Sequence, residues 1–370
     1  MFVVKKEIRA QSNGGFPLTA GDNYEISAIR CLLAVVSLFV MSLPGSADTE
    51  IGTKAYLAKD FDTAFLEFTK SGNQGDMLAK RYLANMYFLG QGTAKDEVQG
   101  TKLAHECAGD GYCYLMYAKS NLGGLGIAVN YAEARIWARK AFAGGVAGVW
   151  EPAGVLLEQI YLINPANRFL VDGKRDMEKY NALARRTLEQ RAEEVEALDA
   201  LAASAQAGFA PARLLLSTVL FDTGAGTAEK ICSLLAGIND LPERLQKDLT
   251  ISQQVAQLGP TRASPKLVMD SMPGVSEAAT IQASHAGIQQ PASCKDFKVL
   301  RFLGATPIDH ATWLPLTQPL VANTYPLTGV WSEDWSVSLC GRVSTVKIQF
   351  TADGMGGAYW HMGPNQIPPP

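Results

Sequence analysis

MYFLGQGTAKDEVQGTKLAHECAGDGY (residues 86–112) and NLGGLGIAVNYAEARIWARKAFAGGVAG (residues 121–148) follow one pattern at an offset of 34 residues. Each has two glycines one residue apart, then Asp or Asn, then a segment that closes in glycine. The agreeing positions are Ala84, Gly92, Asp96, Leu103, Cys107 and Gly111 in the first copy and Ala118, Gly126, Asn130, Trp137, Ala141 and Gly145 in the second. Agreement at one fixed offset indicates a structural repeat rather than accidental periodicity in a helical bundle.

Each copy predicts two helices joined by a turn. Residues 77–90 carry apolar side chains at helical spacing. Gly90 and Gly92 end that helix, because glycine accepts the left-handed conformation that follows a helix. Residues 95–108 predict the second helix, with acidic residues in the first turn, where the macrodipole favours negative charge.

A single helix pair leaves its apolar stripe uncovered, whereas stacked pairs cover one another. We therefore expect a mainly α protein in which residues 48–258 form an α-solenoid of helix-turn-helix repeats. We expect four to six helix pairs with an irregular middle. In this interpretation residues 48–75 are a degenerate first repeat without a clear first helix, and residues 177–203 are one long charged helix.

The repeat pattern resembles that of the Sel-1-like repeat family, a relative of the tetratricopeptide fold, and the resemblance is strongest over residues 76–148. It implies an exported bacterial protein with an adaptor or regulatory role, one that assembles complexes or controls envelope signalling. Some cysteine-rich relatives have been linked to β-lactam binding, but this sequence has no S-x-x-K motif followed by S-D-N and K-T-G.

The first 47 residues resemble a secretory leader. Residues 31–43 form an apolar run after Arg30, and small residues precede Asp48. This order predicts a signal peptide cleaved after Ala47, hence a periplasmic protein; an uncleaved inner-membrane anchor over residues 31–43 is the alternative. The residues before the run are long for a leader, so either the natural start lies downstream of Met1 or the leader is extended.

Export makes the cysteines disulfide candidates. Cysteine-rich members of the Sel-1-like family bridge two helices at a junction like the one between Cys107 and Cys113, although with a longer spacing. Cys294 and Cys340 are the second expected pair, because a bridge would stabilise a small sheet domain. Cys232 is then left as a buried apolar residue.

The last third of the chain changes character. Residues 259–293 are rich in Pro, Gly, Ser, Gln and Ala and predict a linker. Residues 294–370 predict a small antiparallel β domain of about five strands. The apolar face of its main strand is expected to hold Trp331, Trp335, Val337 and Leu339. The tryptophans of this region are either the core of the sheet or an aromatic platform for a glycan or peptide, and the core interpretation is preferred.

The sequence carries no evident catalytic centre, and we expect a non-enzymatic protein. A formal net charge of −3 gives no electrostatic case for nucleic-acid binding. The four histidines are not clustered at ligand spacing and CxxC is absent, so neither a metal nor a cofactor is expected. The histidines are His105, His285, His310 and His361.

The expected function is that of a periplasmic scaffold or adaptor that binds a protein or peptide partner. Solenoids present a concave face lined by the first helix of each pair. The positions expected to be exposed on that face are Lys80, Asn85 and Phe88 in one copy and Tyr114, Lys119 and Leu122 in the next. The alternative is a cell-wall-binding or hydrolytic enzyme of the envelope.

Overall fold

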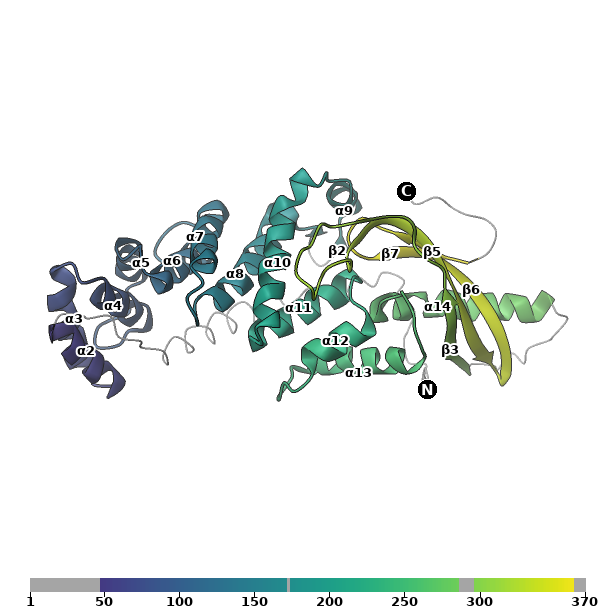
Figure 1. Cartoon of the computed structure of the whole chain (residues 1–370), viewed down its shortest axis with the longest axis horizontal. Coiled ribbons are helices and arrows are strands. Elements are labelled where there is room, and N and C mark those ends of the chain that lie inside the picture. The colour runs from purple at the N-terminus through teal and green to yellow at the C-terminus, as the bar shows by residue number, and fades with distance from the viewer. Residues whose placement is uncertain (1–46, 172–173, 286–295, 363–370) are drawn as a thin grey trace. The chain divides into compact units, whose positions relative to one another are not determined.

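The computed structural model describes residues 47–171, 174–285 and 296–362. The described chain divides into two compact units that meet in sequence at Arg168 and Phe169. Within these described residues thirteen α-helices, with a two-stranded hairpin after the seventh, precede an antiparallel sheet of five strands (Figure 1). The expected fold class, mainly α with a C-terminal antiparallel sheet, is confirmed. The predicted leader and its cleavage site fall outside the described residues, apart from Ala47.

The described residues of the first unit form three helix pairs and a further helix. Its elements are α2 (Ala47–Leu57), α3 (Phe61–Asn73), α4 (Met77–Leu89), α5 (Glu97–Glu106), α6 (Gly111–Gly123), α7 (Tyr131–Ala143), α8 (Trp150–Ile163) and the short η2 (Pro165–Asn167). Consecutive helices pack on each other, as stacked hairpins do. The predicted degenerate first repeat is wrong in one respect, because α2 supplies the first helix that we expected to be missing.

The repeated acidic and amide residues are helix caps. Asp96 Oδ1 accepts hydrogen bonds from the backbone N–H groups of Val98 and Gln99, both 3.0 Å long, at the start of α5. Its counterpart Asn130 accepts from Glu133 N at 3.1 Å at the start of α7. Short polar side chains at this position satisfy N–H groups that the first helical turn leaves free.

The repeated glycines have two separate roles. Gly90 and Gly124 end α4 and α6 in the left-handed conformation, with φ of 69° and 68°. Two residues later, Gly92 and Gly126 lie against the first turn of the preceding second helix. A methyl group on Gly126 would lie 2.5 Å from the carbonyl oxygen of Glu97, so only glycine fits there.

The second unit begins with a small hairpin and six helices. Its elements are β1 (Leu170–Val171), β2 (Lys174–Arg175), α9 (Met177–Ala184), the short η3 (Glu189–Arg191), α10 (Ala192–Gln206), α11 (Ala210–Thr223), α12 (Ala228–Leu235), α13 (Glu243–Gln257) and α14 (Pro265–His285). The strands of its sheet are β3 (Phe297–Ala305), β4 (Asp309–Trp313), β5 (Pro326–Leu339), β6 (Arg342–Ala352) and β7 (Ala358–His361).

The predicted single helix over residues 177–203 is wrong, because the chain breaks between α9 and α10. Thr187 and Gln190 cap each other across the break: Thr187 N donates to the Gln190 side chain at 2.9 Å, and Gln190 N donates to Thr187 Oγ1 at 3.3 Å. This reciprocal pair is a capping box, which starts a new helix. The charged residues continue on both sides of the break, so their pattern gives no sign that the helix ends there.

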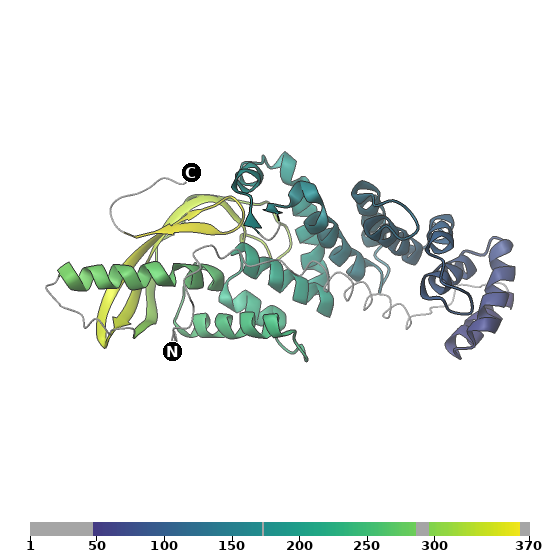
Figure 2. The same cartoon turned by 180° about the vertical axis from the view of Figure 1, so that it is seen from behind.

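The predicted linker over residues 259–293 is also wrong in its described part, which contains the 21-residue helix α14. Pro273 and Gly274, which belong to the composition that predicted a linker, lie inside this helix. Gly274 leaves room for the ring of Trp360 from β7, since a methyl group there would lie 2.4 Å from it. In Figures 1 and 2 the helix lies beside the sheet, and its apolar side chains share one core with the strands.

The sheet has the strand order β3-β5-β6-β7, and β4 also pairs with β5. The expected alternation on its main strand is confirmed, because Trp331, Trp335, Val337 and Leu339 are all buried. β5 begins at Pro326, five residues before Trp331, and pairs with β4 on one side over this first part. Because the sheet shares its core with α13 and α14, the predicted boundaries at residues 258 and 294 lie inside the second unit.

Candidate interaction surface on the helical repeats

The six positions expected on the exposed face divide into two groups. Lys80, Tyr114 and Lys119 are half-buried, while Asn85, Phe88 and Leu122 are buried. The expectation of exposure is therefore wrong for the second group. Gly100 explains Phe88: it has no side chain, and a methyl group there would lie 3.0 Å from the phenyl ring. The ring occupies that space between α4 and α5 instead of facing solvent.

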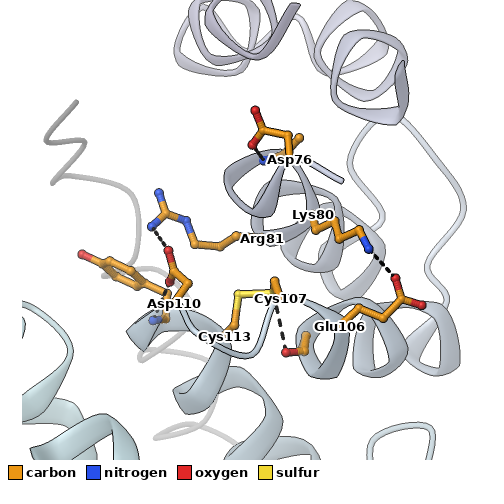
Figure 3. Close-up of a disulfide and its surroundings, with 10 residues drawn as sticks. Asp76, Lys80, Arg81, Glu106, Cys107, Asp110 and Cys113 are labelled. Atoms are coloured by element: carbon orange, nitrogen blue, oxygen red, sulfur yellow. Dashed lines mark hydrogen bonds and ion pairs between the residues drawn. A yellow bond between two sulfur atoms is a disulfide. The ribbon is translucent and has the colours of Figure 1, made fainter. Parts of the chain in front are cut away.

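Lys80 is already paired. Its Nζ lies 2.8 Å from Glu106 Oε2 at the end of α5, as Figure 3 shows. The hydrogen bond from Lys80 holds the pKa of Glu106 below its usual range. This pair links the first and second helices of one repeat, so we assign Lys80 to the repeat itself rather than to a partner.

Lys119 has no such partner in the part of the chain that the structure describes. It lies on α6 between Leu115, four residues before it, and Leu122, three residues after it, and both leucines are buried. Residues at this spacing lie on one helix face. Among the described residues no acid pairs with Lys119, and burial lowers the pKa of its ammonium to about 8. Lys119 is therefore a cation in an apolar setting that the described repeats do not neutralise.

Asn85 occupies the position equivalent to Lys119 in the preceding copy. Its Nδ2 donates to the hydroxyl of Tyr56 at 2.9 Å, and that hydroxyl donates to Gln91 Oε1 at 3.1 Å. Its Oδ1 is buried and accepts no hydrogen bond from the described residues. Buried polar atoms normally have a hydrogen-bond partner. The two equivalent positions both depart from this rule, because neither Asn85 Oδ1 nor the Lys119 ammonium has a partner among the described residues.

Tyr114 belongs to an aromatic cluster on three helices. Its ring centroid lies 5.5 Å from that of Trp137 on α7, and Tyr117 lies 5.1 Å from the same ring. His105 of α5 packs on Tyr117 at 4.7 Å. Lys140 Nζ lies 3.9 Å above the Trp137 ring, a cation–π contact. The members of the cluster contact one another, and these contacts hold α5, α6 and α7 together.

A disulfide fixes the junction between the two copies. Cys107 and Cys113 are bonded, with their Cα atoms 5.8 Å apart, and both are buried (Figure 3). Beside them Arg81 of α4 donates to Asp110, the N-cap of α6, at 3.0 Å. The expected bridge is thus present, and together with the ion pair it sets the angle between neighbouring hairpins.

The remaining cysteine predictions have different outcomes. Cys294 lies outside the described residues, so its predicted pairing is not described. Cys340 does take part in a disulfide. Cys232 is a free thiol, as expected, but it is only half-buried rather than fully buried. Burial still raises the pKa of this thiol, which makes it a poor nucleophile.

Replacing both Cys107 and Cys113 with alanine is expected to lower the free energy of unfolding of the first unit by about 2 kcal/mol, the value for a closed loop of this length. Alanine is the natural substitute, since Ala141 and Ala147 stand at the equivalent positions of the next copy. Urea denaturation with and without dithiothreitol measures the change. Reductant should lower the stability of the first unit in the wild type but not in the alanine variant; a first unit of unchanged stability in the reduced wild type would contradict the prediction.

The described part of the second unit offers little reactive chemistry. His310 Nδ1 lies 3.0 Å from Asp309 Oδ2, but both side chains are largely exposed. No group of three or more metal-ligating residues occurs among the described residues. Trp331 and Trp335 are 3% and 0% exposed, so the aromatic-platform interpretation is wrong for them. None of the described helices has the length and apolarity needed to span a membrane.

No protein-family profile and no curated protein matches the sequence. Among solved structures the chain is similar to a Sel1 repeat protein from Oxalobacter formigenes, with 21% identity and a TM-score of 0.38, over 58% of this chain and 55% of that one. It is also similar to c5321, described as a protective antigen of uropathogenic Escherichia coli with an SLR fold, with 18% identity and a TM-score of 0.37, over 66% of this chain and 58% of that one. The match therefore spans somewhat more than half the length of each of these proteins.

Proposed function

We propose that this chain is a non-enzymatic repeat protein of the periplasm that binds a protein or peptide partner through the first helices of its repeats, α4 and α6. The observation that carries the proposal is Lys119. It is half-buried between two buried leucines, and it has no acidic partner among the described residues. A half-buried charge without a counter-charge destabilises the repeat. It is available to form an ion pair or a hydrogen bond with a partner molecule.

The pKa of Lys119 gives the sign and size of its effect on stability. The folded-state pKa of about 8 lies below the ordinary value of 10.5. The folded state therefore binds a proton less readily than the unfolded state, and this destabilisation is complete below pH 8 and disappears as the pH rises towards 10.5. The difference between these two pKa values corresponds to about 3 kcal/mol. Residues that lower stability are expected where function requires them.

The variant Lys119→Met is expected to be more stable than the wild type by about 3 kcal/mol at pH 7, because methionine keeps the unbranched side chain and removes the charge. The free energy of unfolding of the wild type should rise between pH 8 and 10.5, and that of the variant should not. The same variant should fail to capture the partner that the wild type captures from a periplasmic extract. Thermal and urea unfolding measure the first effect, and quantitative pull-down measures the second.

Lys54→Met is the matched control, because Lys54 is an exposed lysine of the same unit and is paired with Glu50 at 2.8 Å. It should change neither stability nor capture appreciably. A Lys119→Met protein that is less stable, or that captures the same partner as well as the wild type does, would contradict the proposal. Stabilisation of the wild type by peptidoglycan fragments or β-lactams, without a protein partner, would favour the envelope-enzyme alternative.

A further inference from the structure

Lys140 lies against two aromatic rings rather than against an acid. Its Nζ is 3.9 Å from the centroid of the Trp137 ring and 6.0 Å from that of the Tyr114 ring. The two centroids are 5.5 Å apart and the ring planes are inclined at 42°, so the rings form a corner that faces one ammonium. Both rings are half-buried and Lys140 is exposed. This ring corner therefore lies at the surface and already holds a cation.

The preceding repeat shows that the fold does not require rings at this place. At the 34-residue offset the counterparts of Tyr114 and Lys140 are Lys80 and Glu106, which form an ion pair at 2.8 Å. Lys140 forms no ion pair with an acid in the part of the chain that the structure describes. An exposed cation on a ring face changes an equilibrium constant by only about two- to fivefold. A second cation therefore needs little affinity to displace Lys140.

Three neighbours hold the rings in place. Tyr117 contacts the Trp137 ring at 5.1 Å with the planes at 89°, and His105 contacts the same ring at 5.7 Å with the planes at 75°. Glu133, one turn earlier on α7, accepts a hydrogen bond from Trp137 Nε1 at 3.0 Å. These contacts fix the indole before any ligand arrives. The Glu133 carboxylate also adds negative charge beside the ring corner, which favours a cation there.

We propose that the ring corner of Tyr114 and Trp137 binds the quaternary ammonium group of a small molecule or a lipid headgroup, which takes the place of Lys140. A primary ammonium carries three N–H donors, and ring faces offer no lone pairs to accept them. A trimethylammonium group carries no N–H, so it leaves water without losing hydrogen bonds. This site needs no protein partner and therefore goes beyond the proposed function.

The test uses the full chain and three small probes, followed through the NMR signal of the Trp137 indole N–H. Choline carries the trimethylammonium group, 3,3-dimethyl-1-butanol is its neutral isostere, and ethanolamine is its primary-amine relative. Choline should bind about tenfold more tightly than the neutral isostere, because cation–π attraction requires the charge. It should also bind more tightly than ethanolamine. Sodium chloride at equal concentration is the control for ionic strength.

Two variants test the displacement of Lys140. Lys140→Ala empties the ring corner and should strengthen choline binding about two- to fivefold, since the competing cation is gone. Lys102→Ala is the matched control, because Lys102 is also an exposed lysine on the second helix of a repeat. It should leave choline binding unchanged. Equal affinities of these two variants for choline would show that Lys140 does not occupy the site.

Two further variants test the rings. Trp137→Leu should abolish choline binding, measured by calorimetry, and leucine is compatible with the repeat because Leu103 is the counterpart of Trp137. The double variant Tyr114→Lys with Lys140→Glu introduces the residues that form the ion pair of the preceding copy. It should fold like the wild type, as thermal unfolding will show, and should not bind choline.

Vesicles distinguish the two sources of the group. Sedimentation with phosphatidylcholine vesicles, but not with phosphatidylglycerol vesicles, would assign the site to a lipid headgroup, whereas binding of free choline alone would assign it to a solute. Equal binding of choline and its neutral isostere, undiminished binding by Trp137→Leu, or binding of neither choline nor phosphatidylcholine would overturn this inference. None of these results involves Lys119, so the proposed function is tested separately.

Discussion

Replacing Arg191 with methionine is expected to lower the free energy of unfolding of the second unit by about 3–5 kcal/mol, the usual effect of removing one member of a buried ion pair. The Arg191 side chain is only 1% exposed. Its guanidinium donates to Glu194 at 3.1 Å and to the carbonyl oxygens of Leu183, Ala184 and Gly354, the last at 2.6 Å. Methionine would leave these carbonyls without their donors.

The experiment follows thermal unfolding of the full chain by circular dichroism. A loss of this size lowers the melting temperature of a unit of this length by about 10 °C. Arg185→Met is the matched control, because Arg185 is exposed and lies only six residues away. A melting temperature of Arg191→Met equal to that of the control would contradict the prediction.

A second variant shows which part of the fold Arg191 supports. Tyr180 donates its hydroxyl to Asp353 at 2.8 Å, so Tyr180 and Arg191 both hold the loop between β6 and β7. If that loop is their common target, the effects of Tyr180→Phe and Arg191→Met will not add in the double variant. The expected coupling is about 0.5–3 kcal/mol, and strict additivity would show that the two residues act on different parts of the unit.

This loop shows what the sequence could and could not predict. Its residues Ala352-Asp353-Gly354 predict a turn, and the structure confirms a turn there. The turn packs against residues that are distant in sequence. A methyl group on Gly354 would lie 2.9 Å from the carbonyl oxygen of Ala184, and one on Gly357 would lie 2.6 Å from that of Thr223. The glycines are therefore required by helices more than a hundred residues away, and no local pattern reveals that requirement.

The repeats were predictable for the opposite reason. The helix caps Asp96 and Asn130 and the terminal glycines Gly90 and Gly124 act on residues close to them in sequence, so their spacing appears directly as a 34-residue period. Helix α14 was missed because Pro273 and Gly274 are unfavourable in an isolated helix, while in the fold Gly274 accommodates Trp360. Tertiary packing outweighs local propensity there, and it also buries the candidate residues Phe88 and Leu122.

The candidate site was only partly predictable. The period identified the equivalent positions Asn85 and Lys119, but it gave no indication that Lys119 lacks a counter-charge while Lys80 has one. That difference depends on Glu106, which lies 26 residues from Lys80 and has no acidic counterpart in the second copy, where Lys140 stands at its position. Comparing the charges of the two copies position by position could have shown it.

Glu333 is a buried acid in the sheet core that the alternating pattern did not predict. It is 1% exposed and lies on the same face of β5 as Trp331 and Trp335. Both indole N–H groups donate to its carboxylate, at 3.2 Å and 2.9 Å. The turn before α14 supplies three more donors: Thr261 Oγ1 at 2.6 Å, Arg262 N at 2.9 Å and Ala263 N at 3.0 Å.

The variant Glu333→Gln is expected to lower the free energy of unfolding of the second unit by about 3 kcal/mol, although it preserves the shape of the side chain. A carboxylate accepts on both oxygens, whereas an amide presents its own N–H₂ group to donors on one side. Either Trp335 Nε1 or the backbone donors of Arg262 and Ala263 then lose their acceptor, and each orphaned buried donor costs about 1–3 kcal/mol. Urea denaturation followed by tryptophan fluorescence measures the loss.

Two further variants make this prediction specific. Asp334→Asn, on the opposite face of the same strand, changes the same kind of group where it is partly solvated, and it should alter stability by no more than about 0.5 kcal/mol. Glu333→Leu should be more destabilising than Glu333→Gln, because it removes every acceptor from the five donors. If leucine is tolerated as well as glutamine, the carboxylate does not organise this core, and the attachment of α14 to the sheet rests on apolar packing alone.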